Sequence, residues 1–122
     1  MLKYIMTIAQ ILDLYDISFI KVKDKNSYSK LFYGGGELEM FFTYFRDPDN
    51  IETEIIQLID HYLNGNPFPV DNNLTVENGD FVDVSALSVT FTNRESFKIS
   101  QSIPLSHFRD ITQAWVDFLR NG

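Results

Sequence analysis

The stretch Leu105-Ser106-His107-Phe108-Arg109-Asp110-Ile111-Thr112-Gln113-Ala114-Trp115-Val116-Asp117-Phe118-Leu119-Arg120 decides the fold, because it has the pattern of one long amphipathic helix. Its large apolar residues recur mostly at steps of three and four, which predicts one buried face: Leu105, Phe108, Ile111, Trp115, Phe118 and Leu119. Pro104 precedes the pattern, and proline suits the first turn of a helix. We expect removal of this helix, at about 105–120, to expose a large apolar surface and to prevent folding.

A second helix is predicted at about 51–63. Its apolar residues also follow helical spacing: Ile51, Ile55, Leu58, Ile59, Tyr62 and Leu63. Asp49 and Glu52 have the spacing of a capping box, in which each side chain accepts a hydrogen bond from a free amide at the helix start. Asn64-Gly65 then predicts the end of the helix, because glycine readily adopts the left-handed conformation found there.

Strands are predicted in two central regions. The segment 37–46 starts with alternating polar and apolar residues and continues as a nearly unbroken apolar run, typical of a strand inside a sheet. Gly34-Gly35-Gly36 before it predicts a turn or bulge. Residues 81–92 are rich in β-forming residues, and Thr92-Asn93-Arg94-Glu95 predicts a turn into 96–100, hence a hairpin.

Two further regions leave alternatives open. Residues 74–76 could pair with the strand at 81, through the favoured turn pair Asn78-Gly79. Residues 4–15 and 17–22 fit one or two strands, but the stretch from Ile8 to Leu14 also satisfies the helical template.

The order of strands, helix, strands, helix predicts an α+β fold, mainly an antiparallel sheet with the two helices packed on one side. A chain of 122 residues has the length of one domain, so 1–122 is predicted to be a single domain. Apolar residues make up 44% of the chain and include 11 Phe, 6 Tyr and 1 Trp, enough to form a core.

The absence of cysteine excludes a disulfide framework, a thiolate zinc site and a cysteine nucleophile. This composition is typical of a reducing compartment. The first residues carry a single Lys, and Gln10 and Asp13 interrupt them before an apolar run reaches signal-peptide length. We therefore expect a cytoplasmic protein.

Residue patterns for catalysis or metal binding are missing. His61 and His107 have no second His or Cys at ligand spacing, so a metal site is not expected. Asp47-Pro48-Asp49-Asn50 resembles the start of a calcium loop but lacks the later Gly and Glu, and is better explained as a helix cap. Ser106 stands beside His107 in the first turn of a helix, where serine is common. We predict no catalytic residue, no cofactor and no enzyme activity.

Charge is distributed unevenly along the chain, whose net charge is −7. Residues 47–93 contain no Lys or Arg and nine acids, namely Asp47, Asp49, Glu52, Glu54, Asp60, Asp71, Glu77, Asp80 and Asp83. Their net charge is −9, against +2 for the remainder. This balance argues against nucleic acid or an anionic membrane as the partner, because both are bound by clustered basic residues. The acids either form a solvated face that maintains solubility, or attract a basic protein.

Tyrosines lie close to the acidic region in the sequence. Tyr33, Tyr44 and Tyr62 can be core residues or interface anchors, since tyrosine is common in protein-binding surfaces. Combining the two features, we predict these partner-binding residues: Asp47, Asp49, Glu52, Asp60, Asp71, Glu77, Asp80, Asp83 and Tyr44.

The segment from Ser102 to Leu119 resembles the end of several small bacterial immunity proteins, in which a strand leads into a Pro-Leu helix start with a buried Phe and Trp. Those proteins belong to contact-dependent inhibition and related polymorphic toxin systems. The resemblance implies binding and neutralisation of a cognate toxin domain, with a nuclease as the expected class. The matching residues, Pro104-Leu105, Phe108 and Trp115, are structural and assign no binding residue.

Two other functions are compatible with the sequence. One is a small-ligand-binding or enzymatic α+β domain with a pocket between sheet and helices. The other is a homo-oligomer in which a strand at 41–45 pairs across a sheet edge with a second copy.

Overall fold

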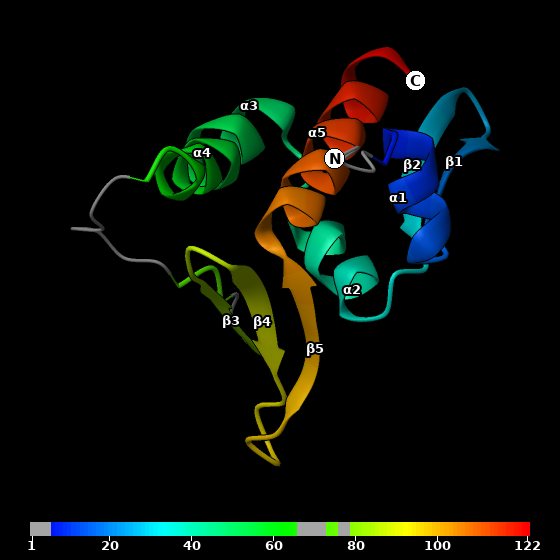
Figure 1. Cartoon of the computed structure of the whole chain (residues 1–122). Coiled ribbons are helices and arrows are strands. Elements are labelled where there is room, and N and C mark those ends of the chain that lie inside the picture. The colour runs from blue at the N-terminus through cyan, green and yellow to red at the C-terminus, as the bar shows by residue number, and fades with distance from the viewer. Residues whose placement is uncertain (1–5, 66–72, 76–78) are drawn as a thin grey trace.

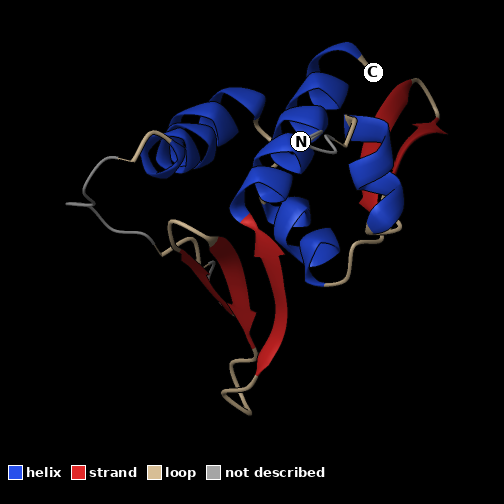
Figure 2. Cartoon of the chain, viewed as in Figure 1, coloured by secondary structure: helices blue, strands red, loops and turns tan. Residues whose placement is uncertain are grey.

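A computed structural model describes residues 6–65, 73–75 and 79–122 of the chain (Figure 1). In chain order, its elements are α1 (Ile8–Leu14), β1 (Ser18–Asp24), β2 (Ser27–Tyr33), α2 (Glu37–Tyr44), α3 (Pro48–Ile51), η1 (Glu52–Ile56), α4 (Gln57–Leu63), β3 (Phe81–Val84), β4 (Ser88–Thr92), β5 (Ile99–Pro104) and α5 (Leu105–Asn121). The predicted α+β class with antiparallel strands is confirmed. The strands form two sheets, a β1–β2 hairpin and a three-stranded sheet in the order β3-β4-β5 (Figure 2).

Helix α5 occupies the centre of the molecule, as the sequence predicts for 105–120. It leaves the end of β5 and runs between α3–α4 on one side and α1 with the β1–β2 hairpin on the other (Figure 1). Leu105, Phe108, Ile111 and Trp115 are buried on its inner face. Phe118 and Leu119 pack partly buried against the same core.

The predicted helix at 51–63 is part of a longer helical run from Pro48 to Leu63, which contains a wider π-helical turn at η1. The expected capping box at Asp49 is wrong. Asp47 is the cap, and its Oδ1 accepts a hydrogen bond of 3.1 Å from the amide of Asp49. Pro48 explains the earlier start, because its fixed φ and missing N–H suit the first helical position.

The predicted strand at 37–46 is wrong, because Glu37–Tyr44 forms the helix α2. Alternation covers only its first residues, whereas Leu38, Phe41, Phe42 and Phe45 have helical spacing and face the core. With a helix at this position, pairing of two copies through a strand at 41–45 loses its structural basis.

The turn expected at Gly34-Gly35-Gly36 is present and reorients the chain into α2. All three glycines have positive φ. Gly34 has φ +82, and a Cβ there would lie 1.9 Å from the carbonyl oxygen of Asp16. Only glycine fits such an approach without displacing the backbone.

The segment 81–92 is itself a hairpin and not a single strand. The Ser85 Oγ accepts hydrogen bonds from the amides of Leu87 and Ser88, which turns the chain between β3 and β4. The hairpin expected between 81–92 and 96–100 is confirmed, since β4 pairs with β5, but its second strand begins at Ile99 and not at Ser96. The pairing expected between residues 74–76 and the strand at 81 is also present among the described residues. The Leu74 amide donates a hydrogen bond of 2.9 Å to the Val82 carbonyl. Most of the predicted turn around Asn78-Gly79 lies outside the described residues.

The amino-terminal alternatives resolve to a helix followed by a strand. Thr7 and Gln10 form a capping box at the start of α1. The β1–β2 hairpin then packs against α2 and α5. Its Lys30 ammonium donates to the carbonyl oxygens of Phe118 at 3.0 Å and Leu119 at 2.8 Å, where a positive charge complements the helix dipole.

Within the described part of the chain, every helix is too short or too polar to cross a lipid bilayer.

Candidate protein-binding surface

The predicted binding residues on the helical run 48–63 are largely occupied by ion pairs with α5. Arg120 contacts both Asp49, at 2.5 Å, and Glu52. Arg109 Nε lies 3.0 Å from Asp60 Oδ1, and this hydrogen bond raises the pKa of the Arg109 guanidinium. These three carboxylates are therefore partly neutralised within the fold, although they lie in a sequence region without basic residues.

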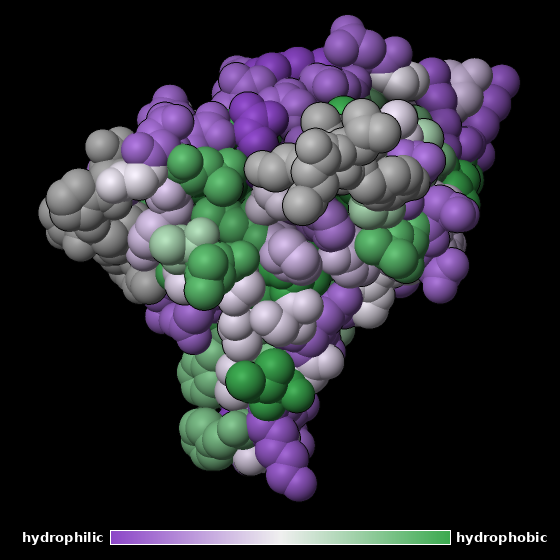
Figure 3. All heavy atoms as spheres, in the orientation of Figure 1, coloured by the Kyte–Doolittle hydropathy of each residue, from purple (hydrophilic) through white to green (hydrophobic). Residues whose placement is uncertain are grey.

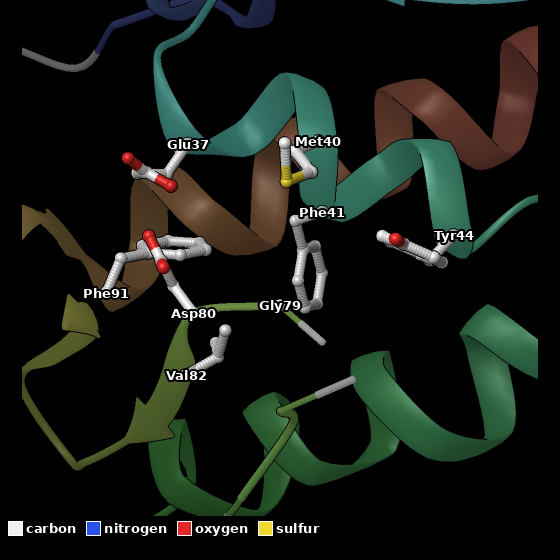
Figure 4. Close-up of a pocket in the computed structure, with 8 residues that line it drawn as sticks. All are labelled: Glu37, Met40, Phe41, Tyr44, Gly79, Asp80, Val82 and Phe91. Atoms are coloured by element: carbon white, nitrogen blue, oxygen red, sulfur yellow. The ribbon is translucent and has the colours of Figure 1, made fainter. Parts of the chain in front are cut away.

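The other predicted residues are distributed over different elements. Asp47 caps α3, and Asp83 is exposed on β3. Asp71 and Glu77 lie outside the described residues. Asp80 and Tyr44 both line a recess between α2 and residues 79–82, but they lie on opposite sides of it (Figure 4).

We define the α2 surface by the polar and exposed side chains around this recess: Glu37, Glu39, Met40, Thr43, Tyr44 and Asp80. Met40 and Tyr44 are one helical turn apart and are 58% and 55% exposed. A shallow, open depression on the outer side of α2 runs past Glu39 and Thr43. A neighbouring hollow of about 160 Å³ extends this region to Tyr33, which is also exposed, whereas Tyr62 is partly buried against the core.

The recess itself is shallow, with Phe41, Val82 and Phe91 as its apolar floor (Figure 4). Its cavity volume of about 20 Å³ has room for roughly one water molecule. Small-ligand sites are usually several hundred Å³ in volume and enclose most of the ligand. This recess therefore suits a single inserted side-chain group and does not suit a whole metabolite.

Glu37 and Asp80 face each other across the recess (Figure 4). Burial raises the pKa of the Glu37 carboxyl, and the neighbouring Asp80 carboxyl group raises it further. The nearby Ser100 hydroxyl acts in the opposite direction. When both carboxyl groups of the pair are ionised, they repel each other and attract a positive charge.

The start of α2 is held to the sheet by Gln101 of β5. The amide of Glu37 donates to Gln101 Oε1 at 2.8 Å, and Gln101 Nε2 donates to the Gly35 carbonyl at 3.0 Å. This clamp fixes the position of Glu37 relative to Asp80. The α2 surface is thus preorganised by contacts between segments far apart in the sequence.

His107 is the strongest alternative position for chemistry, because its Nδ1 lies 2.8 Å from the Tyr15 hydroxyl. Burial raises the pKa of the Tyr15 phenol. The pair joins the end of α1 to the first turn of α5, which is a packing contact. Among the described residues, no three His, Cys, Asp or Glu side chains are grouped closely enough to hold a metal ion.

Comparison of the chain with protein families, with curated proteins and with solved structures gave no match. Glu37 and Met40 were missed as binding residues because the segment has the pattern of a strand, in which Glu37 and Glu39 share a solvated edge. In a helix, the spacing of Met40 and Tyr44 identifies one exposed face.

Proposed function

We propose that this protein is a binding module that captures a cationic protein domain through the α2 surface. Its role, on this proposal, is that of a cytoplasmic immunity protein that neutralises a cognate toxin domain, with a nuclease as the expected class. The observation that carries the proposal is the exposure of Met40 and Tyr44 beside three carboxyl groups, those of Glu37, Glu39 and Asp80.

The two exposed side chains are suited to anchoring a partner. Tyrosine combines a large apolar ring with a hydroxyl and loses little conformational entropy on burial, and it is enriched among residues that dominate binding energy. Methionine adapts its shape to an apolar partner surface. Placed one turn apart on α2, Met40 and Tyr44 offer a partner two adjacent exposed side chains on the outer side of the helix.

The negative charge of the α2 surface favours a cationic partner. The Asp49, Glu52 and Asp60 carboxylates are paired with arginines of α5, whereas the Glu37 and Asp80 carboxyl groups face each other across the recess. An arginine or lysine from a partner would relieve the repulsion of this pair, and Tyr44 lines the same recess. Complementary charge also accelerates association, by roughly 10- to 1000-fold at low salt.

To inhibit a nuclease, such a protein only has to cover the surface that holds the nucleic acid. A nuclease needs a basic surface to hold its substrate, and an acidic protein that covers this surface excludes nucleic acid. A typical stable interface buries about 800 Å² on each partner, a much larger area than the recess. We therefore expect residues around the α2 surface to contribute contacts as well.

The direct experiment is co-expression with the product of the gene just upstream, which the proposal expects to contain the toxin domain. The proposal predicts that cells producing the toxin domain survive only when this protein is present, and that the two proteins co-purify as a stable complex. Cell death in the presence of abundant folded protein, with no complex recovered, would refute it.

A further inference from the structure

Phe97 combines an unusual backbone with an unusual exposure. It lies in the β4–β5 loop (residues 93–98), has φ +57 and leaves 73% of its surface exposed. Left-handed backbone is unfavourable for bulky residues, and glycine or asparagine normally occupies such positions. A large apolar side chain on strained backbone, facing solvent, is unfavourable for an isolated protein and suggests a contact with another molecule.

The loop around Phe97 is held rigidly by Asn93. The Asn93 Oδ1 accepts hydrogen bonds from the amides of Glu95 at 3.0 Å and Ser96 at 2.9 Å. Its carbonyl oxygen accepts from the Phe97 amide at 2.9 Å, and its own amide donates to the Lys98 carbonyl at 2.8 Å. These four bonds fix the direction in which the Phe97 side chain leaves the loop.

Phe97 also has a support on one side. Its ring stacks on Phe81, with ring centres 6.0 Å apart and planes 20° from parallel. The Arg94 guanidinium lies 4.9 Å from the centre of the Phe81 ring. Ile99 adds a second exposed apolar side chain two residues later. Figure 3 shows apolar residues gathered at this end of the three-stranded sheet.

The loop is connected to the α2 surface through Arg94. The Arg94 amide donates to Asp80 Oδ1 at 3.3 Å, and its Nε donates to the Gly79 carbonyl at 2.6 Å. Asp80 in turn faces Glu37 across the recess (Figure 4). Phe97 is therefore held in a fixed position relative to the carboxyl pair, and an interface of ordinary size can include both.

We propose that Phe97 is the principal apolar anchor of the interface and inserts into an apolar pocket of the same cationic protein domain that the α2 surface binds. This inference rests on the proposed function. The rigid loop lowers the entropic cost of binding, because the side chain is already held in one position before the partner arrives. On this proposal, the backbone strain at Phe97 is offset by its contribution to binding the partner.

The test uses Phe97→Gly, which removes the ring and also removes the backbone strain. Lys25→Gly is the matched control, because Lys25 is exposed, has φ +55 and also lies in a hairpin turn. Both variants should keep or raise the melting temperature, since glycine adopts positive φ freely. Binding to the purified toxin domain from the upstream gene should weaken at least about ten-fold for Phe97→Gly. It should stay within about two-fold of wild type for Lys25→Gly.

The outcomes separate the two proposals. If wild-type protein binds the toxin domain and Phe97→Gly binds equally well, the anchor is refuted and the proposed function stands. A lower melting temperature for Phe97→Gly would also refute it, because the ring would then be structural. If wild-type protein does not bind the toxin domain, the proposed function fails and the anchor fails with it. Binding of wild-type protein, but not Phe97→Gly, to phosphatidylglycerol vesicles would assign Phe97 to a membrane and overturn the inference.

Discussion

The indole Nε1–H of Trp115 donates a hydrogen bond of 2.9 Å to the carbonyl oxygen of Phe45. The bond joins the middle of α5 to the residue that follows α2, two elements 70 positions apart in sequence. The ring of Trp115 also contacts those of Phe19 and Phe32, each with centres 5.4 Å away. Trp115 therefore holds α2, and with it the α2 surface, against the central helix.

Trp115→Phe should destabilise the protein by roughly 2–3 kcal/mol, because it leaves a cavity and an unpaired buried carbonyl at Phe45. Urea unfolding followed by far-UV circular dichroism measures the change. A decrease of less than about 0.5 kcal/mol in the free energy of unfolding would show that α2 is held by other contacts.

Gly34→Ala should be strongly destabilising, since the added Cβ would lie 1.9 Å from the Asp16 carbonyl oxygen. Gly65→Ala is the matched control, because Gly65 also has positive φ but a Cβ added there would meet no atom within 4 Å. We expect a cost of about 1 kcal/mol at Gly65 from backbone strain alone, and roughly 2–4 kcal/mol at Gly34. Equal costs at the two sites would contradict the close approach of Gly34 to Asp16.

The Glu37–Asp80 pair predicts a specific pH dependence. The pKa of Glu37 is raised in the folded protein, so the folded state holds its proton more tightly than the unfolded state. The pair's contribution to stability is therefore fully present below the ordinary glutamate pKa of about 4.3 and is lost as pH rises through the raised value. Glu37→Gln keeps a hydrogen-bond donor towards Asp80 and removes the titration.

At neutral pH, we expect Glu37→Gln to be at least as stable as the wild-type protein. The difference between the two proteins should shrink or reverse below the ordinary glutamate pKa. Urea unfolding at a series of pH values measures it. Parallel stability curves for the two proteins over this range would contradict the carboxyl pair.

The long helix and the class of fold could be predicted from the sequence because they depend on local periodicity. The apolar pattern of 105–120 has no reasonable alternative to a helix, and it is confirmed within one residue at its end. The strand predicted at 37–46 is wrong because a short apolar run satisfies both templates. The Gly34–Gly36 turn and the contacts of Phe42 with Phe32 and Phe108 select the helix, and these depend on residues distant in sequence.

The candidate site was predictable only in part for the same reason. Tyr44 and Asp80 can be selected from residue type alone. Which carboxylates form ion pairs with α5 and which do not depends on tertiary contacts. Arg120 lies 71 positions from Asp49, and Arg109 lies 49 positions from Asp60. No local pattern in the sequence shows that these carboxylates are neutralised by α5.

The measurement that tests the central claim most directly compares Tyr44→Ala with Tyr28→Ala in binding to the product of the gene just upstream, which the proposed function expects to contain a toxin domain. The two tyrosines are 55% and 57% exposed, and Tyr28 lies on the β1–β2 hairpin, away from the α2 surface. Isothermal titration calorimetry should show binding weakened at least about ten-fold by Tyr44→Ala, or roughly 1.4 kcal/mol. It should show little change for Tyr28→Ala, and wild-type affinity should fall as salt is added. Equal affinities for both variants, or a stronger effect of Tyr28→Ala, would contradict binding through the α2 surface.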